Sequence, residues 1–341
     1  MKSITSAITS VGGYVPETVL TNFDLEKMVD TNNEWIISRT GIKERRILKD
    51  KSLGTSFMAI NAANKLLQEK DVDPTSIDLV IVSTATPDMP VSSTASFVAT
   101  EIGASNAFGY DIQGACSGFL FGMSAACAHI CSGRYRKVLL IGADKMSSIV
   151  DYEDRKTCVI FGDGAGAVLF EPNYEGYGLK DEILKVDGNG RNFLKIEAGG
   201  SMLPASNQTI ENRQHFLQQD GRPVFKFAVS YMSEVITKLL KRNSLEKNEI
   251  DYVVPHQANK RILDAIARNL DLAPGKMLTN IEKYGNTTAA TLPLLLWDNR
   301  KNFKKNEKLI FTAFGAGFTW GASYLTCLLY TSPSPRDHQP S

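Results

Sequence analysis

The strongest candidate for nucleophilic chemistry in the sequence is Cys116. It is flanked by Ala115, Ser117 and Gly118, directly before an apolar stretch that predicts a helix. A helix N-terminus favours a thiolate, and small neighbours leave room for a substrate, so this setting suits a nucleophile. A free cysteine is also among the residues most often buried, so taken alone Cys116 could simply fill space in a core.

Two further side chains could assist such a nucleophile. His256 directly follows residues 252–255, an apolar run that predicts a buried strand, and it therefore stands at the strand's carboxyl end, where open α/β sheets place their sites. Asn286 lies in a small-residue loop, residues 285–289, before a second apolar helical stretch. Each has a plain alternative, because a histidine can be satisfied within a core and an asparagine can be a helix cap.

An internal repeat indicates how these residues are positioned. Residues 66–82 align with residues 239–255 without a gap, and each stretch predicts a helix end, a polar turn and a buried strand. A second pair of apolar runs, residues 138–143 and 309–314, follows at nearly the same shift. The repeat also sets the Cys116 loop close to the Asn286 loop, so we expect both at related ends of two duplicated halves.

The alternation of helices and buried strands predicts a layered α/β architecture with mostly parallel sheets. We expect one half at residues 1–175, with the cysteine, and another at residues 176–327, with the histidine and the asparagine. Residues 328–341 are polar and rich in proline and serine, and we expect them to be disordered or an artefact of the sequence.

Composition excludes several classes of protein. With 43% hydrophobic and 22% charged residues, the chain has the material for a large core. A net charge of +1 argues against nucleic-acid binding, and no leader or membrane-spanning run is visible. The five cysteines fit neither a disulfide framework nor a metal motif, which favours the cytoplasm and predicts no metal site.

A glycine-rich run, residues 162–167, could be mistaken for a nucleotide-binding loop. We expect a strand at residues 158–161 before it, but the third glycine of a dinucleotide fingerprint is missing, and the run continues as a strand instead of a helix. We therefore interpret it as a tight structural turn.

Several motifs together resemble the β-ketoacyl-ACP synthase III family of the thiolase superfamily, over nearly the whole chain. They are the surroundings of the three candidate residues and four further segments: residues 115–118, 254–259, 284–288, 30–31, 34–36, 39–42 and 317–321. The resemblance implies a thiolase-like fold of two duplicated α/β halves in a layered αβαβα arrangement, and a homodimer.

The resemblance also implies a reaction without a cofactor. Cys116 takes the acyl group of acetyl-CoA or a similar acyl-CoA. Malonyl-ACP then loses CO₂ while His256 and Asn286 donate hydrogen bonds to the developing enolate, and 3-oxoacyl-ACP forms as the first product of fatty acid synthesis. The backbone amides of Cys116, Ala316 and Gly317 would form the oxyanion hole. Ala316 replaces a glycine found in many members, and its amide can serve if the backbone there tolerates a Cβ.

The resemblance assigns binding roles to three sets of residues. CoA contacts fall on Thr31, Trp35, Arg39, Arg155, Gly221 and Asn259, with adenine held between Trp35 and Arg155. The acyl pocket would involve Phe225 and, across the dimer interface, Met89. Acyl carrier protein (ACP) would meet a basic collar of Lys226, Lys260 and Arg261. We interpret Lys43, Arg45 and Arg46 as a solvated basic face.

Three other functions stay open. A cysteine hydrolase could use Cys, His and Asn in this order, although no papain-type cysteine motif is present. A condensing enzyme of secondary metabolism would keep the fold and change the substrate. A catalytically silent acyl-binding protein would not need all three residues.

Overall fold

Two large β-sheets with the same strand order organise the chain, which we describe from a computed structural model covering residues 4–328. The first sheet has the order β1 (Thr5–Tyr14), β7 (Gly164–Asn173), β6 (Val138–Asp144), β4 (Leu79–Ser83) and β5 (Phe108–Ile112). The second has the order β8 (Gly178–Val186), β13 (Thr319–Thr326), β12 (Lys308–Gly315) and β11 (Tyr252–Pro255).

The strand directions repeat as well. In the first sheet β4 is parallel to β6, while β7 is antiparallel to both β6 and β1. In the second, β11 is parallel to β12, while β13 is antiparallel to both β12 and β8. The prediction of mostly parallel sheets is therefore wrong, since the strands at one side of each sheet run antiparallel. β5, which is parallel to β4, is matched in the second sheet only by an isolated bridge between Val253 and Met277.

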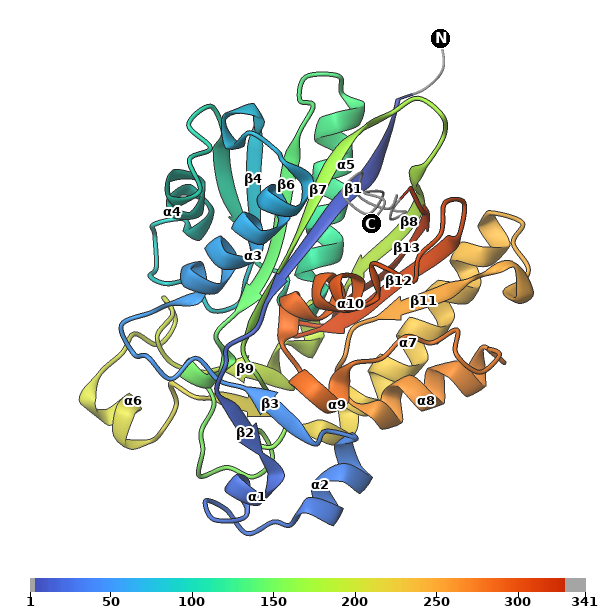
Figure 1. Ribbon diagram of the computed structural model, residues 1–341. Helices are drawn as coiled ribbons and strands as arrows, with labels where there is room; N and C mark the ends of the chain where they lie inside the picture. The colour runs from blue at the N-terminus through green and yellow to red at the C-terminus, as the bar shows by residue number, and fades with distance from the viewer. Residues whose placement is uncertain (1–3, 329–341) are drawn as a thin grey trace, which may run out of the picture.

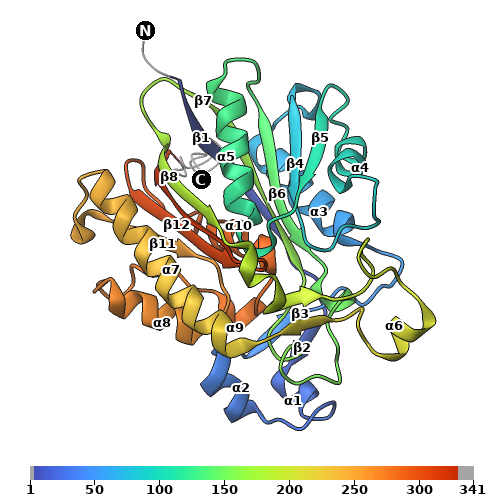
Figure 2. The ribbon, with the colours of Figure 1, turned by 180° about the vertical axis from the view of Figure 1, so that it is seen from behind.

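Helices form three layers around the two sheets (Figures 1 and 2). α5 (Gly118–Cys131) and α10 (Thr291–Asn299) lie between the sheets. The outer face of the first sheet is covered by α3 (Thr55–Lys70) and α4 (Thr94–Glu101), and that of the second by α7 (Gly221–Arg242) and α8 (Lys260–Asn269). This is the αβαβα arrangement, so the fold prediction is confirmed.

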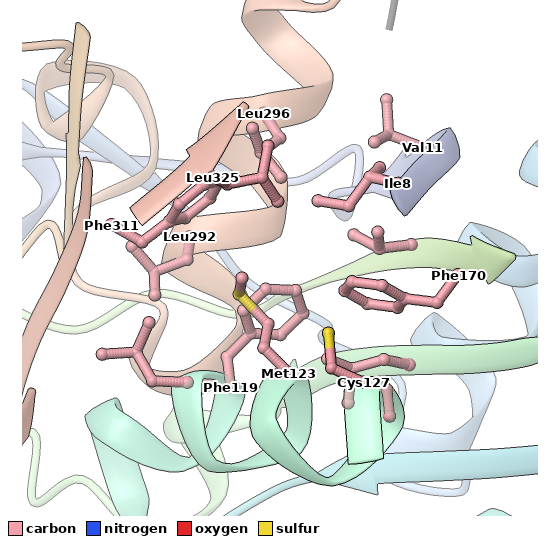
Figure 3. Packing of buried hydrophobic residues seen from close by; sticks show 14 of the residues in the cluster. Ile8, Val11, Phe119, Met123, Cys127, Phe170, Leu292, Leu296, Phe311 and Leu325 are labelled. Carbon is pink, nitrogen blue, oxygen red and sulfur yellow. The ribbon is translucent and has the colours of Figure 1, made fainter. Parts of the chain in front are cut away.

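The middle layer is apolar because it meets a sheet on both sides. Figure 3 shows side chains from both central helices packed against strands of both sheets, including Phe119, Met123, Leu292, Leu296, Ile8, Phe170, Phe311 and Leu325. A helix that is apolar all round belongs in a core, and burial of this kind provides the main driving force for folding. The N-termini of α5 and α10 are consequently buried in the centre of the molecule.

The remaining elements gather at one end of the sheets, at the bottom of Figure 1. They are β2 (Val19–Thr21), α1 (Asn22–Leu25), α2 (Asn33–Thr40), β3 (Glu44–Arg46), β9 (Leu194–Ile196), α6 (Asn207–Glu211), β10 (Leu217–Gln219) and α9 (Ile281–Tyr284). A fourth buried cluster, which includes Leu25, Ile36 and Phe161, holds part of this cap together.

The glycine-rich run at residues 162–167 is structural, as predicted, but the strand expected before it is wrong. Residues 158–160 form a turn, and the run leads into β7. Asp163 is fully buried and accepts hydrogen bonds from the amides of Leu48 and Ser147, each at 2.8 Å. These bonds hold the turn in place beside Asn286, whose backbone pairs with Phe161.

Arg45 corrects the interpretation of a solvated basic face. Its side chain is fully buried and donates to the Oδ1 of Asn22 at 2.9 Å and to the carbonyls of Leu20 and Val159. Burial among neutral acceptors lowers the pKa of the guanidinium to about 10. Lys43 is exposed, as expected. Arg45 therefore ties β3 to the turn that precedes β7.

β7, the last strand of the first sheet along the chain, ends at Asn173, and β8 of the second sheet begins at Gly178, so a short connection joins the two sheets. The boundary at residues 175 and 176 stays a prediction, and the expectation for the tail after residue 328 lies outside the described residues. Within residues 4–328, no helix combines the length and the apolar character needed to cross a membrane.

Phe170 offers a test of the middle layer. It is fully buried on β7 in the cluster that joins both sheets. We expect Phe170→Ala to lower the free energy of unfolding by about 3–5 kcal/mol, because it removes apolar contacts and leaves a cavity. Urea unfolding followed by circular dichroism measures the effect, with Phe23→Ala, at a residue that is 60% exposed, as the matched control. Equal losses in both variants would contradict the assigned core.

Candidate active site

Cys116 lies in a strained turn at the buried start of α5. The turn η2 (Ala115–Ser117) follows β5, and Ala115 has a φ of 45°, which non-glycine residues rarely adopt. A Cβ on Gly114 would come within 2.8 Å of the Phe121 ring, so the turn needs small residues. Cys116 itself is only 5% exposed. The turn therefore places Cys116 in the interior of the molecule.

A second turn of the same kind starts α10. The turn η6 (Thr288–Ala290) begins at Thr288, whose φ is 54°. Ala115 and Thr288 are separated along the chain by the same number of residues as Leu66 and Leu239 of the repeat. The structural counterpart of Cys116 is therefore Ala289, and Asn286 lies three residues before it, which refines the alignment of the two loops expected from sequence.

Asn286 is held so that its amide nitrogen can donate. Its Oδ1 accepts a hydrogen bond from the Thr288 amide at 2.9 Å, and a backbone amide can only donate, so the amide orientation of the side chain is fixed. Its own backbone is pinned to the turn before β7, with its N–H donating to Ile160 at 2.9 Å and its carbonyl accepting from Gly162 at 3.1 Å. The Nδ2 group is thus left for a ligand.

His256 stands at the end of β11, as the sequence indicated. Its backbone amide donates to the Thr312 carbonyl at 2.8 Å, which continues the pairing of β11 with β12. The imidazole is 1% exposed, and its Nδ1 lies 2.7 Å from the Thr291 hydroxyl. Burial lowers the pKa of His256 to about 3, so the ring is neutral at neutral pH.

One cavity of about 1070 Å³ collects the three candidate residues. Cys116, His256 and Asn286 all border it, although they come from three separate segments. The same cavity extends past α7 to Trp35 and Arg155. Its volume suits a large elongated ligand that ends at the thiol.

Burial keeps the thiol of Cys116 protonated at neutral pH. Burial raises the pKa of Cys116 to about 12, with a smaller contribution from the negative charge of Asp144. Asp144 is itself fully buried, which raises its pKa to about 6, and it accepts hydrogen bonds from Ala85, Thr86 and Ala289 amides. The thiolate favoured by the helix N-terminus must therefore form only as the thiol reacts.

The loop after β12 lies directly against the Cys116 turn. A Cβ on Gly315 would sit 2.9 Å from the Cys116 amide nitrogen, so only glycine allows this approach. The Thr319 hydroxyl donates to the Gly114 carbonyl at 3.1 Å. Ala316 avoids the positive φ values that Gly317 and Phe318 adopt, so the condition for accepting its Cβ is met. Neither Ala316 nor Gly317 borders the cavity, and their oxyanion role stays a prediction.

Five of the six residues expected to contact CoA line the cavity: Trp35, Arg39, Arg155, Gly221 and Asn259. Thr31 does not. The Arg155 guanidinium carbon lies 5.2 Å from the centre of the Trp35 ring. An aromatic base between the two groups needs about 7 Å, so the arginine must move outward for a sandwich to form.

Only some of the residues expected at the acyl pocket border the cavity, and only some of those expected at the protein-binding surface are free exposed cations. Phe225 borders the cavity, and the Arg261 guanidinium lies 5.4 Å from the centre of its ring. Met89 is 58% exposed and does not border the cavity of this chain. Lys226 is exposed, whereas the Lys260 ammonium is 2.7 Å from Asp264 and partly neutralised.

Sequence reasoning missed most of the apolar wall. Val224, Ala228 and Met232 on α7 all line the cavity, as do Leu194 and Phe314. The first three are spaced by four residues, so they share one helix face, and this spacing after Gly221 could have revealed them. Leu194 and Phe314 carry no such signal. Among the described residues, no cluster of His, Cys, Asp or Glu side chains is placed to hold a metal ion.

Two sheets of matched topology around two central helices, with a cysteine at the buried start of one of them, define a thiolase-like enzyme fold. Sequence profiles of the family described as 3-oxoacyl-[acyl-carrier-protein (ACP)] synthase III match residues 110–188, and its C-terminal part matches residues 240–327. The β-ketoacyl-[acyl-carrier-protein] synthase III 2 of Bacteroides thetaiotaomicron is 54% identical over 95% of this chain and 97% of its own.

Solved structures of related synthases are similar to the structure of this chain. The 3-oxoacyl-[acyl-carrier-protein] synthase III of Aquifex aeolicus is 40% identical, with a TM-score of 0.86 over 94% of this chain and 99% of its own. The priming β-ketosynthase of the R1128 polyketide pathway is 30% identical, with a TM-score of 0.87 over 94% and 96%. The chain belongs to the β-ketoacyl-ACP synthase III family.

The low pKa of His256 predicts a pH dependence of stability. The pKa is about 3 in the folded protein and about 6.5 in an unfolded chain, so the unfolded state binds more protons between these values. The histidine therefore removes stability as the pH falls below about 6.5, by at most about 1.4 kcal/mol per pH unit. We expect the melting temperature of His256→Gln to fall less than that of the wild type between about pH 7 and 5.

Differential scanning fluorimetry across this range makes the comparison. Above about pH 8 the imidazole is neutral in both states, so the two curves should run parallel there. Parallel curves at acid pH as well would contradict a neutral, buried His256.

Proposed function

We propose that this protein is a β-ketoacyl-ACP synthase III that condenses an acyl-CoA primer with malonyl-ACP. The observation that carries the proposal is the single cavity bordered by Cys116, His256 and Asn286. It joins a nucleophile at a buried helix start to two groups that can donate hydrogen bonds. The high identity to curated synthases over nearly the whole chain supports the same activity.

In the first step the Cys116 sulfur attacks the thioester carbonyl of acyl-CoA. A bond forms between the sulfur and the acyl carbon, the bond from that carbon to the CoA sulfur breaks, and the thiol proton ends on CoA. The buried start of α5 stabilises the developing thiolate. Amides of Cys116 and of the loop containing Ala316 and Gly317 would stabilise the tetrahedral oxyanion.

In the second step malonyl-ACP loses CO₂, and the electron pair of the broken bond moves onto the thioester as an enolate. The Asn286 Nδ2 and the His256 Nε2 would donate hydrogen bonds to the enolate oxygen. The enolate carbon then attacks the acyl group on Cys116, and the departing thiolate takes a proton from solvent. The product is 3-oxoacyl-ACP. The electron pair stays on organic atoms stabilised by hydrogen bonds, so we propose that no cofactor takes part.

The outer part of the cavity would bind CoA. Trp35 and Arg155 offer two planar surfaces for adenine, and Asn259 is fixed in place because its Nδ2 donates to the Arg39 carbonyl at 3.0 Å. Exposed cations near Gly221, among them Lys226 and Arg261, would attract the acidic carrier protein by charge complementarity. The five cysteines of the sequence fit no disulfide framework, which supports a cytoplasmic location.

Two alternatives compete with this activity. The similarity to a priming β-ketosynthase of polyketide synthesis favours a related condensing enzyme, but at 30% identity it is weaker than the 54% shared with a curated synthase III. A cysteine hydrolase would need His256 as a base at the thiol and water at the acyl group. The apolar wall formed by Val224, Ala228 and Phe314 works against water at that position.

We also propose a homodimer formed through the edge strand β5. This strand is one of the two edge strands of the first sheet, and Phe108 on it is 44% exposed. Met89, Val91 and Phe97 add exposed apolar surface on the neighbouring loop and on α4. Exposed strand edges and apolar patches mark interaction surfaces. A second copy there would give exposed Met89 a partner, in line with its expected role in the other subunit's acyl pocket.

The roles of the three residues can be separated by step. We expect Cys116→Ser to abolish covalent labelling by radiolabelled acetyl-CoA. Asn286→Ala and His256→Ala should label at rates within about threefold of the wild type, yet decarboxylate malonyl-ACP about 100-fold more slowly, because each loses one donor to the enolate. Radiolabel transfer and CO₂ release measure the two steps. Free acetate released without malonyl-ACP would favour a hydrolase, and equal losses in both steps would refute the division of roles.

The dimer surface has its own test. We expect Phe108→Asp to convert the protein to a monomer in size-exclusion chromatography with light scattering, because it buries a charge in the proposed interface. Phe23→Asp, at an exposed phenylalanine on α1, is the matched control and should leave the mass of a dimer. A wild-type protein that is monomeric at micromolar concentration would refute the proposed interface.

A further inference from the structure

Within residues 4–328, the imidazole of His256 has one hydrogen-bond partner, the side chain of Thr291. Its hydroxyl lies 2.7 Å from Nδ1, and both side chains are 1% exposed. The same hydroxyl lies 2.9 Å from the carbonyl oxygen of Thr288. A hydroxyl has one proton, so it can donate to one of these two groups only.

The choice decides which nitrogen of His256 carries the proton. If the hydroxyl donates to the Thr288 carbonyl, Nδ1 must donate to Thr291, and the neutral ring then presents a lone pair at Nε2. If the hydroxyl donates to Nδ1, the ring proton is on Nε2. The low pKa of His256 makes the ring neutral, so these two tautomers are the relevant states.

Two observations favour donation to Nδ1. The Thr288 carbonyl already accepts the backbone N–H of Thr291, so losing the hydroxyl proton leaves no buried group without a partner. The distance of 2.7 Å to Nδ1 is typical of a hydroxyl donor and at the short end of the range for a ring N–H donor. The second contact of the hydroxyl, at 2.9 Å, then only holds its oxygen in position.

We infer that Thr291 is a positioning residue that donates its hydroxyl proton to Nδ1 of His256 and so holds the Nε2–H tautomer toward the cavity. Its catalytic consequence rests on the proposed function, because the enolate oxygen needs a donor at Nε2. Asn286 is oriented in the same way by the neighbouring Thr288 amide, so one turn and the start of α10 prepare both donors. Fixing a ring through its second nitrogen is a general way to set its tautomer.

Nuclear magnetic resonance of the full-length wild-type protein tests the tautomer directly. With ¹⁵N-labelled histidine, long-range ¹H–¹⁵N correlation at neutral pH distinguishes a protonated ring nitrogen from an unprotonated one, which resonates far downfield. The spectrum of His256→Gln assigns the signal by its loss. We expect Nδ1 to be unprotonated and Nε2 protonated. A protonated Nδ1 in the wild type overturns the inference, whether or not any variant folds.

Variants then connect the tautomer to the reaction. We expect Thr291→Val to give a mixed tautomer and to slow malonyl-ACP decarboxylation by about 10–100-fold, while acylation by acetyl-CoA changes less than about threefold. Thr291→Ser keeps a hydroxyl and should restore both the tautomer and decarboxylation. The control for a general loss of stability is Thr55→Val. Thr55 is on α3, and the substitution removes its buried hydroxyl, which donates to the Thr86 carbonyl.

The outcomes separate this inference from the proposed function. If His256→Ala keeps full decarboxylation, the proposed role of the histidine fails irrespective of its tautomer. If His256→Ala is inactive but Thr291→Val decarboxylates like the wild type, only the role of Thr291 fails. Equal slowing of both steps in Thr291→Val would assign Thr291 to general stability and overturn the inference.

Discussion

The structure depends on one constraint: two helices enter the space between two sheets, and their first turns must meet there without solvent. Both turns begin with a residue of positive φ, 45° at Ala115 and 54° at Thr288. Such a backbone costs about 1–2 kcal/mol for a residue with a Cβ, so the surroundings must hold it. Asp144 at the end of β6 holds the second of these turns, because it accepts the amide of Ala289 while also accepting the amide of Ala85 after β4. The two turns cannot relax to unstrained φ values because the large apolar core around them is tightly packed.

The same burial determines the electrostatics. It raises the pKa of Cys116 to about 12 and lowers that of His256 to about 3, so both groups are neutral before substrate arrives. With Cys116 and His256 both neutral, the fixed hydrogen-bond donors of the site have their largest effect when negative charge develops on a substrate. This favours reactions that build an oxyanion or an enolate within the cavity over reactions that begin with a charged nucleophile.

Two kinds of feature could be predicted from the sequence: the repeated segments, and the polar residues whose types suit chemistry. The duplicated halves and the segments of Cys116, His256 and Asn286 were found because apolar runs recur at a constant shift and polar residues interrupt them at strand and helix ends. Arg45 was misjudged because a charged residue is usually exposed, and its neutral acceptors at residues 20, 22 and 159 are all distant from residue 45 along the chain. Residues 158–161 were misjudged because an apolar run of four also suits a buried turn. Parts of the cavity wall such as Leu194 were invisible because only the folded chain brings them to the thiol.

The duplication also shows how one turn geometry came to serve two tasks. The residue of the second half that occupies the place of Cys116 is Ala289, which is fully buried and has no reactive group. The polar groups of that half are displaced to either side of the turn: Asn286 precedes it and is oriented by the Thr288 amide, and Thr291 follows it and contacts His256. Because the strained backbone is needed in both halves to bring the helix starts together, it is retained where no nucleophile uses it. In the proposed reaction, the first half therefore supplies the covalent step, and the second half supplies the oriented donors of the second step.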